Sequence, residues 1–144
     1  MILRDEEATA ALGAALARSA RPGDVITLSG PLGVGKTALA RGFIAALGYR
    51  GEVPSPSFAI VQPYEELDPP VWHVDLYRIE QPSEIAELGL DSAYDAVLLV
   101  EWPERAGEDA WPEALVLSLE FGPDGDRILT AKAPPSWEGR WPPR

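Results

Sequence analysis

Apolar and polar positions along the chain repeat with two periods, which predict helices and strands in an alternating order. Apolar and small residues at helical spacing predict helices over residues 5–19 and 38–47, and residues 81–84 begin a short helix with proline near its start. Short apolar runs predict strands at residues 25–28, 58–61, 71–76, 96–100, 114–121 and 127–132. This order of elements is typical of a sheet covered by helices.

Three further features refine this pattern. Residues 96–100 contain no polar side chain, which is typical of a central strand covered on both faces. Asp124-Gly125 predicts a hairpin between the last two strands. Residues 49–57 and the acidic, proline-rich residues 62–70 lack periodicity and predict connecting loops.

The chain of 144 residues is long enough for one domain with a real core, and we expect that domain to cover residues 1–133. Residues 134–144 form a tail rich in proline and tryptophan. Its prolines exclude a regular helix or an inner strand. The sequence leaves open whether the two tryptophans of the tail dock on the domain or the tail is mobile.

Residues 30–37 read Gly-Pro-Leu-Gly-Val-Gly-Lys-Thr and match the phosphate-loop pattern G-x-x-x-x-G-K-[ST]. A predicted strand precedes the motif and a predicted helix follows it, as the motif requires. The glycines let backbone N–H groups turn toward phosphate oxygens, and the helix N-terminus adds partial positive charge. Lys36 is expected to reach the β- and γ-phosphates, and the Thr37 hydroxyl to hold Mg²⁺. The motif therefore predicts a nucleoside triphosphate site formed by Gly33, Val34, Gly35, Lys36, Thr37 and Ala38.

With this loop, the pattern predicts an α/β fold: a three-layer sandwich of the P-loop NTPase type, with a mixed, mainly parallel sheet and a C-terminal β-hairpin. Ligands of such sheets bind at the carboxyl ends of the strands. Glu101 directly follows residues 96–100, so we expect its carboxylate near the phosphate loop, where it can hold Mg²⁺ and help to orient a water molecule. Trp102 either fills the core or separates the nucleotide site from solvent.

A cluster of polar residues ends the strand predicted at residues 71–76. Strand alternation points His73, Asp75 and Tyr77 to one face, where they are costly unless they meet solvent, a partner or a ligand. Asp75 is expected to hold a metal-bound water or to position the water that attacks the γ-phosphate. Arg78 either stabilises developing charge or makes a structural ion pair, and a lone histidine such as His73 cannot form a metal site.

Residues 53–58 lie where P-loop proteins place a segment that senses the γ-phosphate. Ser55 and Ser57 offer hydroxyl groups to Mg²⁺ or phosphate. The two prolines also fit a stiff connector without chemistry, so the residues alone leave both interpretations open.

The composition limits location and partners. The net charge is −11, with 12 basic against 23 acidic residues, which works against direct and stable binding of nucleic acid. Such a surface either keeps the protein soluble or steers it to a basic partner. No apolar stretch approaches the ~20 residues of a membrane span, the start of the chain lacks a secretory pattern, and the absence of cysteine excludes disulfides. We therefore expect a cytoplasmic protein with no membrane contact.

Together these elements resemble the TsaE family, small ATPases needed for the threonylcarbamoyladenosine (t6A) modification of tRNA. The resemblance covers about residues 6–130. It rests on the phosphate loop, on Ser-Pro-Ser-Phe at 55–58, on His-Val-Asp-Leu-Tyr-Arg at 73–78 and on Glu-Trp at 101–102. It implies that the loop binds ATP, that Thr37 and Glu101 serve Mg²⁺, and that Trp102 lies near the nucleotide.

The resemblance further implies that Asp75 takes part in hydrolysis, so that Lys36, Asp75 and Glu101 form the expected catalytic set. It implies TsaD and TsaB as protein partners, with tRNA contacted only indirectly or weakly. Hydrolysis of ATP to ADP and phosphate is then expected to be slow without these partners. Which of Asp75 and Glu101 positions the water stays open.

Three other functions are alternatives to an ATPase. A P-loop small-molecule kinase usually brings several arginines from a lid, whereas the arginines after Arg78 are scattered, at 105, 127, 140 and 144. A GTPase needs an Asn-Lys-x-Asp element, and the chain contains no asparagine. A module that binds ATP without hydrolysing it stays open.

Overall fold

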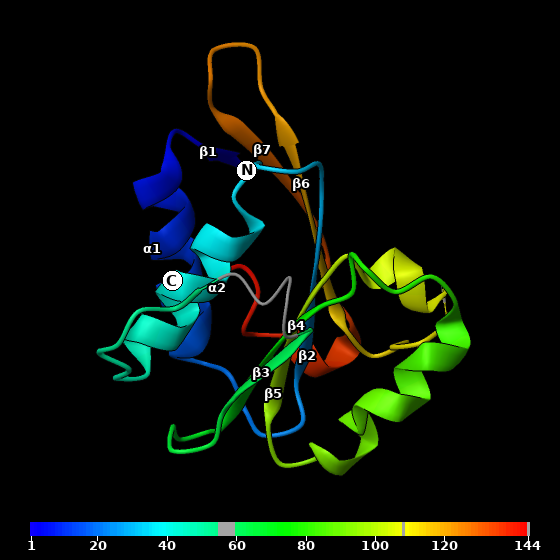
Figure 1. Cartoon of the computed structure of the whole chain (residues 1–144). Helices are drawn as coiled ribbons and strands as arrows, with labels where there is room; N and C mark the ends of the chain where they lie inside the picture. The colour runs from blue at the N-terminus through cyan, green and yellow to red at the C-terminus, as the bar shows by residue number, and fades with distance from the viewer. Residues whose placement is uncertain (55–59, 108, 144) are drawn as a thin grey trace.

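The computed structural model describes residues 1–54, 60–107 and 109–143. Its seven-stranded sheet has the order β1-β7-β6-β2-β5-β4-β3 (Figure 1). Within it, only β3 and β7 run against the other five strands, so the predicted mixed, mainly parallel sheet is confirmed. The strands are β1 (Ile2–Leu3), β2 (Val25–Ser29), β3 (Val61–Tyr64), β4 (Val71–Asp75), β5 (Val97–Glu101), β6 (Leu115–Phe121) and β7 (Arg127–Lys132).

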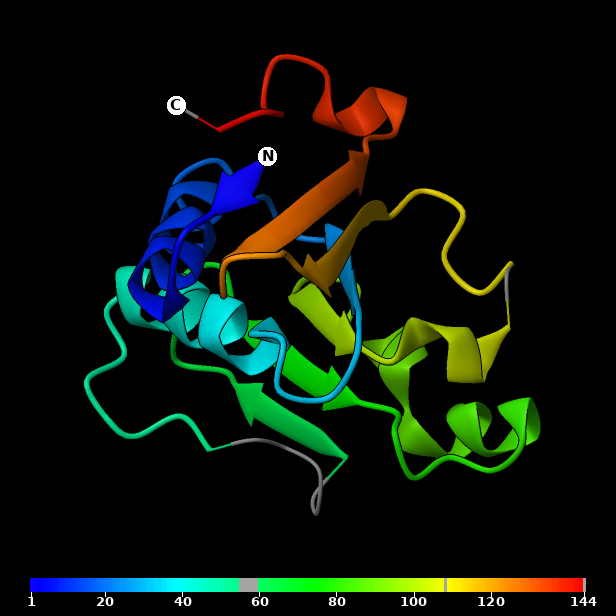
Figure 2. The same ribbon diagram turned by 90° about the horizontal axis from the view of Figure 1, so that it is seen from above.

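Two different layers cover the sheet. The helices α1 (Glu6–Ala17) and α2 (Lys36–Ala46) pack on one face (Figure 2). The other face is covered by short 3₁₀ helices, η1 (Pro82–Leu88), η2 (Leu90–Ser92) and η3 (Pro103–Ala106), around a second, smaller core. All five residues of β5 are buried between these layers, which confirms the central strand predicted from the apolar run.

Close contact between α1 and α2 depends on two glycines. A Cβ atom added to Gly13 would lie 2.0 Å from the carbonyl oxygen of Leu39, and one added to Gly42 would lie 2.0 Å from that of Ala10. No side chain fits at such distances, so the absence of a Cβ lets the two helix backbones touch. This contact holds α2, whose first two residues end the phosphate-loop motif, firmly against α1.

The edge strand β3 lies later in the chain than the sequence predicts. The sequence predicts a strand at residues 58–61 and a connection from residue 62, whereas β3 runs from Val61 to Tyr64 and includes Pro63. Residues 58 and 59 lie outside the described part of the chain. In the described sheet β3 pairs with β4 alone, and at such an edge a proline need not donate to a ladder. Burial of Tyr64, which packs edge-on against Tyr49 at 4.8 Å, holds the segment in place.

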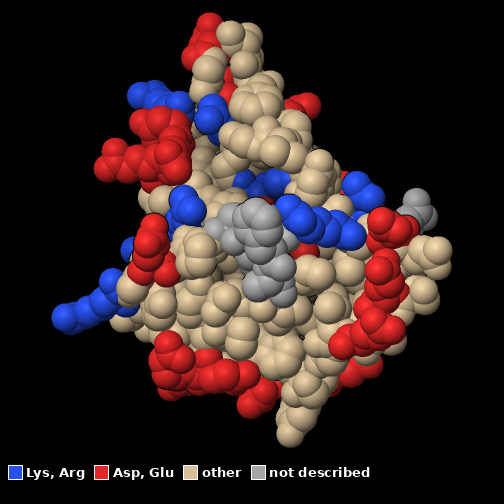
Figure 3. Space-filling model, viewed as in Figure 1, with Lys and Arg blue, Asp and Glu red and all other residues tan. Residues whose placement is uncertain are grey.

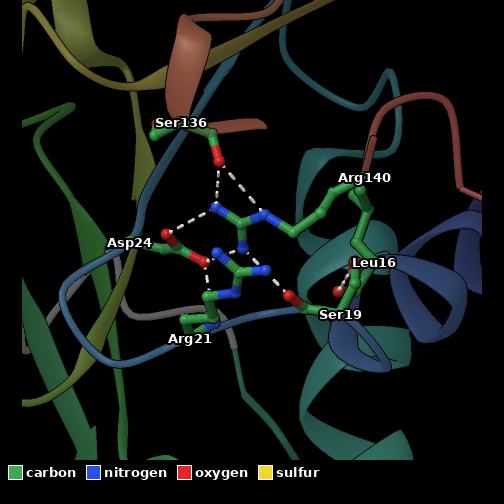
Figure 4. Close-up of polar contacts among 6 residues, drawn as sticks. All are labelled: Leu16, Ser19, Arg21, Asp24, Ser136 and Arg140. Atoms are coloured by element: carbon green, nitrogen blue, oxygen red, sulfur yellow. Dashed lines mark hydrogen bonds and ion pairs between the residues drawn. The ribbon is translucent and has the colours of Figure 1, made fainter. Parts of the chain in front are cut away.

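The C-terminal tail packs against the domain. Its short helix η4 (Pro135–Trp137) ends with the buried side chain of Trp137. The guanidinium of Arg140 donates two hydrogen bonds to the Asp24 carboxylate, at 2.7 and 3.1 Å, and further bonds to the carbonyl groups of Ser19 and Ser136 (Figure 4). Residue 24 directly precedes β2, so this contact joins the tail to the start of a central strand. Within the described residues no helix is long and apolar enough to cross a membrane.

Candidate nucleotide and magnesium site

A cavity of about 430 Å³ opens at the carboxyl ends of β2, β4 and β5, beside the loop that joins β2 to α2. Its volume lies in the range of small-molecule sites, and its place is where α/β sheets bind ligands. The residues that line it are Glu6, Leu32, Gly33, Gly35, Lys36, Thr37, Ala38, Arg41, Asp75, Tyr77, Arg78, Glu101 and Trp102.

The phosphate loop has the backbone conformation that its glycines predict. Gly33 and Gly35 adopt φ angles of +78° and +118°, which other residues rarely tolerate. The helix α2 begins directly after them, at Lys36. Unpaired N–H groups of the first helical turn therefore lie at the cavity, an arrangement that suits an anion such as a phosphate.

Lys36 is held at the loop by two contacts. Its Nζ donates a hydrogen bond of 2.5 Å to the carbonyl of Gly30 and lies 3.5 Å from the centre of the Trp102 ring. Burial lowers the pKa of Lys36, and the negative charges of Glu101, Glu104 and Asp75 partly offset this effect. A bound polyphosphate would add the negative charge that favours the ammonium form.

Thr37 and Glu101 converge from opposite sides of the site, one at the start of α2 and the other at the end of β5. The Thr37 hydroxyl lies 3.2 Å from each carboxylate oxygen of Glu101, and both residues line the cavity. Mg²⁺ in proteins usually takes one or two carboxylates together with substrate phosphates and water. The hydroxyl and the carboxylate supply such a partial set of oxygen ligands, so the residues present fit the ion.

Asp75 lies beside Glu101 because the two residues are paired in the β4–β5 ladder. One of its oxygens, Oδ1, accepts a hydrogen bond of 2.9 Å from the backbone N–H of Tyr77. Burial raises the pKa of Asp75, and the Glu101 charge adds to this, whereas the Tyr77 N–H, His73 and Lys36 act in the opposite direction. A raised pKa makes this carboxylate a better proton acceptor.

Trp102 has a backbone conformation that is rare for a large side chain, with φ of +58°. Its ring lies against Lys36 and 5.0 Å from the ring of Tyr77, and it also packs on the second core. The residue therefore lines the cavity and also fills space behind it. Strained backbone of this kind is concentrated at functional sites.

The fold gathers most of the residues that the sequence predicts for the site. Val34 does not line the cavity: its side chain is buried in the larger core, and its carbonyl accepts a hydrogen bond of 2.8 Å from Arg127. Ser55 and Ser57 lie outside the described residues. The candidate residues that line the cavity are Gly33, Gly35, Lys36, Thr37, Ala38, Asp75, Tyr77, Arg78, Glu101 and Trp102.

Two features of the site were not predicted. Arg41 lines the cavity from α2, and its position four residues after Thr37, on the same side of a helix, was the signal that could have found it. The imidazole of His73 lies 2.6 Å from Glu101, although the sequence assigned it no particular partner. Pairing of β4 with β5 determines this contact, and sequence spacing does not report it.

The charge of the cavity differs from that of the whole chain. Three cationic side chains, Lys36, Arg41 and Arg78, and three carboxylates, those of Glu6, Asp75 and Glu101, line it, so its lining is balanced although the net charge of the protein is −11. Figure 3 shows several Lys and Arg side chains in the middle of one face, with Asp and Glu mainly toward its margins. The cationic side chains at the cavity suit a polyphosphate within an otherwise acidic protein.

The sheet order, the glycine loop and the helix that follows it define a domain of the P-loop NTPase type. The chain belongs to the TsaE family, since the model of that family, described as threonylcarbamoyl adenosine biosynthesis protein TsaE, matches residues 3–128. This confirms the resemblance drawn from the motifs. The family takes part in t6A biosynthesis, as its description states.

Named relatives and a solved structure agree with this assignment. The tRNA threonylcarbamoyladenosine biosynthesis protein TsaE of Bacillus subtilis is 40% identical over 129 residues, which cover 88% of this chain and 80% of the relative. The protein of the same name from Streptomyces coelicolor is 43% identical over 113 residues, or 76% of each chain. The crystal structure of Bacillus subtilis YdiB matches with a TM-score of 0.77 at 34% identity, covering 92% of this chain and 83% of that one.

Proposed function

We propose that this protein is a Mg²⁺-dependent ATPase that binds ATP at the phosphate loop and acts on a TsaB–TsaD complex in t6A modification of tRNA. The observation that carries the proposal is the meeting of Thr37 and Glu101, 3.2 Å apart, in the cavity that Lys36 also lines. A hydroxyl, a carboxylate and an ammonium in this arrangement suit a nucleotide polyphosphate with its divalent ion.

Each residue has a defined task in the proposed reaction. Backbone N–H groups of residues 33–37 and the Lys36 ammonium bind the phosphates, while Thr37 and Glu101 hold Mg²⁺. When bound, the ion neutralises charge on the β- and γ-phosphate oxygens. Asp75, with its raised pKa, orients a water molecule for in-line attack and accepts a proton from it, and Glu101 assists.

Adenine, the protein partners and the location are parts of the same proposal. The sequence contains no element that reads guanine, which favours ATP over GTP. The acidic charge of the whole chain supports action on tRNA through the TsaB–TsaD complex rather than through a direct grip on the nucleic acid. We place the protein in the cytoplasm, where tRNA is modified.

Two substitutions separate binding from hydrolysis. Lys36→Ala should weaken ATP binding by at least about tenfold, because a hydrogen bond to a charged group contributes roughly 1.5–3 kcal/mol. Asp75→Ala should leave that affinity nearly intact, while phosphate release stimulated by TsaB and TsaD collapses. Isothermal titration measures the first effect and a phosphate-release assay the second. Lys132→Ala, which changes the exposed second lysine of the chain, is the matched control.

The pattern of results decides between the proposal and its rivals. Equal loss of ATP binding in the Lys36 and Asp75 variants would assign Asp75 to substrate binding instead of hydrolysis. Phosphate release should be measured with ATP and with GTP, with and without TsaB, TsaD and tRNA. Strong activation by the full set with ATP supports the proposal, whereas transfer of phosphate to a metabolite would identify a small-molecule kinase.

A further inference from the structure

His73 is a completely buried ionisable side chain beside the site, and the mechanism above gives it no task. Its Nε2 lies 2.6 Å from Oε2 of Glu101. Its other nitrogen, Nδ1, is buried and has no hydrogen-bond partner within the described part of the chain. The contact with Glu101 is therefore the polar contact that the imidazole makes in the described structure.

The register of the parallel strands brings these two residues together. In the β4–β5 ladder His73 pairs with Leu99, and Asp75 pairs with Glu101. Alternate residues of a strand share a face, so His73 reaches diagonally along the sheet to Glu101. Glu101 lines the cavity and His73 does not, which means that the imidazole meets the carboxylate from the protein interior. Thr37 meets the same carboxylate from the cavity.

The hydrogen-bond pattern places a proton on Nε2 of the imidazole. With that proton, the ring of His73 donates to Glu101. A ring that carried its proton on Nδ1 alone would place two acceptors 2.6 Å apart and bury an N–H group without an acceptor. Donation from Nε2 is thus the arrangement that satisfies the contact.

We propose that His73 is the positioning residue for the magnesium ligand Glu101, an inference that rests on the proposed function. The bond from Nε2 fixes Oε2, and in this orientation both oxygens of Glu101 lie 3.2 Å from the Thr37 hydroxyl at the cavity. The last torsion of a glutamate is broad and roughly two-fold, so without this bond the carboxylate turns more freely. Side chains that hold a metal ligand in this way typically change metal affinity by about 10–100-fold when they are replaced.

Two simpler roles for His73 predict different behaviour. If His73 only filled space in the core, replacing it by an apolar residue of similar size would leave the Mg²⁺ dependence of nucleotide binding unchanged. As the residue that activates water, it would need access to the cavity, and its side chain is fully buried and lies outside the lining. The donor on Nε2 is therefore the property to test.

The test compares two variants. His73→Leu removes the donor and puts an apolar side chain of similar size in its place. His73→Gln restores a donor, because its amide extends as far as Nε2 of the histidine. Binding of a non-hydrolysable ATP analogue is measured by isothermal titration, first in EDTA and then across a series of Mg²⁺ concentrations. We expect His73→Leu to bind the analogue in EDTA within about threefold of the parent, and to need about 10–100-fold more Mg²⁺ for full affinity. His73→Gln should restore most of the Mg²⁺ response.

A third variant, His73→Asn, covers the case in which the leucine variant does not fold. Its amide is one bond shorter and does not reach Glu101, so it should resemble His73→Leu and not His73→Gln. Thermal unfolding followed by circular dichroism confirms that each variant is folded at the assay temperature.

The Glu101→Gln variant makes the two possible failures distinguishable. If Glu101→Gln weakens the Mg²⁺ response and His73→Leu and His73→Asn do not, the positioning role is wrong and the proposed metal site stands. If Glu101→Gln has no effect on Mg²⁺, the proposed metal site itself is wrong. The positioning role would also be overturned if His73→Leu lost the same affinity for the analogue with and without Mg²⁺. It would equally be overturned if His73→Gln showed no stronger Mg²⁺ response than His73→Asn. In the Glu101→Gln background, His73→Leu should cause no further loss of the Mg²⁺ response.

Discussion

Arg140 joins the C-terminal tail to the residue that precedes β2, and Arg140→Ala measures how much this contact stabilises the domain. Its guanidinium donates to both oxygens of Asp24 and to the carbonyls of Ser19 and Ser136, and it lies 4.0 Å from the centre of the Trp137 ring. The side chains of Arg140 and Asp24 are 7% and 10% exposed, so the pair is nearly buried. The substitution removes every one of these contacts at once.

The loss of unfolding free energy expected for Arg140→Ala depends on the groups that lose their partner. Without Arg140, the carboxylate of Asp24 keeps the backbone N–H of Arg21, at 2.7 Å, as its partner in the described structure. Breaking a buried ion pair by removing one partner costs about 3–5 kcal/mol. Release of the tail would let water reach Asp24 and so lower this cost, but it would also expose Trp137. An aromatic side chain of this kind buries roughly 150–250 Å², which at about 25 cal/mol per Å² corresponds to some 4–6 kcal/mol of lost stabilisation. Since the released tail regains entropy, we expect a loss near 3 kcal/mol.

Urea unfolding followed by far-ultraviolet circular dichroism gives the free energy of unfolding directly. Arg140→Lys keeps the charge but loses the bidentate contact with Asp24, so its free energy of unfolding should lie between those of the parent and of Arg140→Ala. Combining Arg140→Ala with Asp24→Asn should cost less than the sum of the single changes, because no unpaired charge stays buried. Arg4→Ala, at an exposed arginine, should change the free energy of unfolding by no more than about 0.5 kcal/mol.

Two results would refute this reasoning. A loss below about 0.5 kcal/mol for Arg140→Ala would mean that the contact is solvated and contributes as little as a surface ion pair. Strict additivity of the Arg140 and Asp24 changes would mean that the two groups do not depend on each other. Nucleotide affinity should stay unchanged, because Asp24 precedes β2 and the phosphate loop follows it.

The other predictions concern helix packing and pH. Gly42→Ala should destabilise the protein by about 1–3 kcal/mol through overpacking, because the new Cβ would lie 2.0 Å from the Ala10 carbonyl oxygen. Replacing glycine by alanine inside a helix usually stabilises a protein by about 1 kcal/mol, so the effect expected here has the opposite sign. A raised melting temperature would therefore contradict the packing argument. Burial raises the pKa of Asp75 in the folded state, so the part of the stability that depends on Asp75 should fall as pH rises from about 3.9, the unfolded value, through the folded pKa. Asp75→Asn removes this loss, and urea unfolding should show the variant more stable than the parent at pH 7, by a margin that shrinks toward pH 4. A margin independent of pH would show that the Asp75 charge is not the cause.

Parts of the site could be predicted because their causes are local in the sequence. The conformation of the phosphate loop follows from Gly33 and Gly35, and the position of Lys36 follows from the helix that starts there. The place of Glu101 follows from the apolar run before it, since an unbroken apolar strand lies at the centre of a sheet and ends at its ligand-binding edge. These inferences needed only the chemistry of a few neighbouring residues.

Other parts could not be predicted because they depend on which segments meet. The sequence placed residue 63 in a connection, since it gives no sign that β3 lies at an edge where proline is tolerated. It left open whether the tail docks, because the partner of Arg140 lies 116 residues away. The sequence placed His73 on one face of a strand with other polar residues, but the contact of His73 with Glu101 depends on the pairing of β4 with β5.

By itself, then, the sequence determined the main helices, most strands, the phosphate loop and the family, because spacing, glycine content and motif residues act over a few positions. The tertiary structure decided which residues share the cavity, which carboxylate His73 meets, what covers each face of the sheet and where the tail is held. These features arise from contacts between residues far apart in the chain, and such contacts exist only once the strands have found their order and the helices have packed on them.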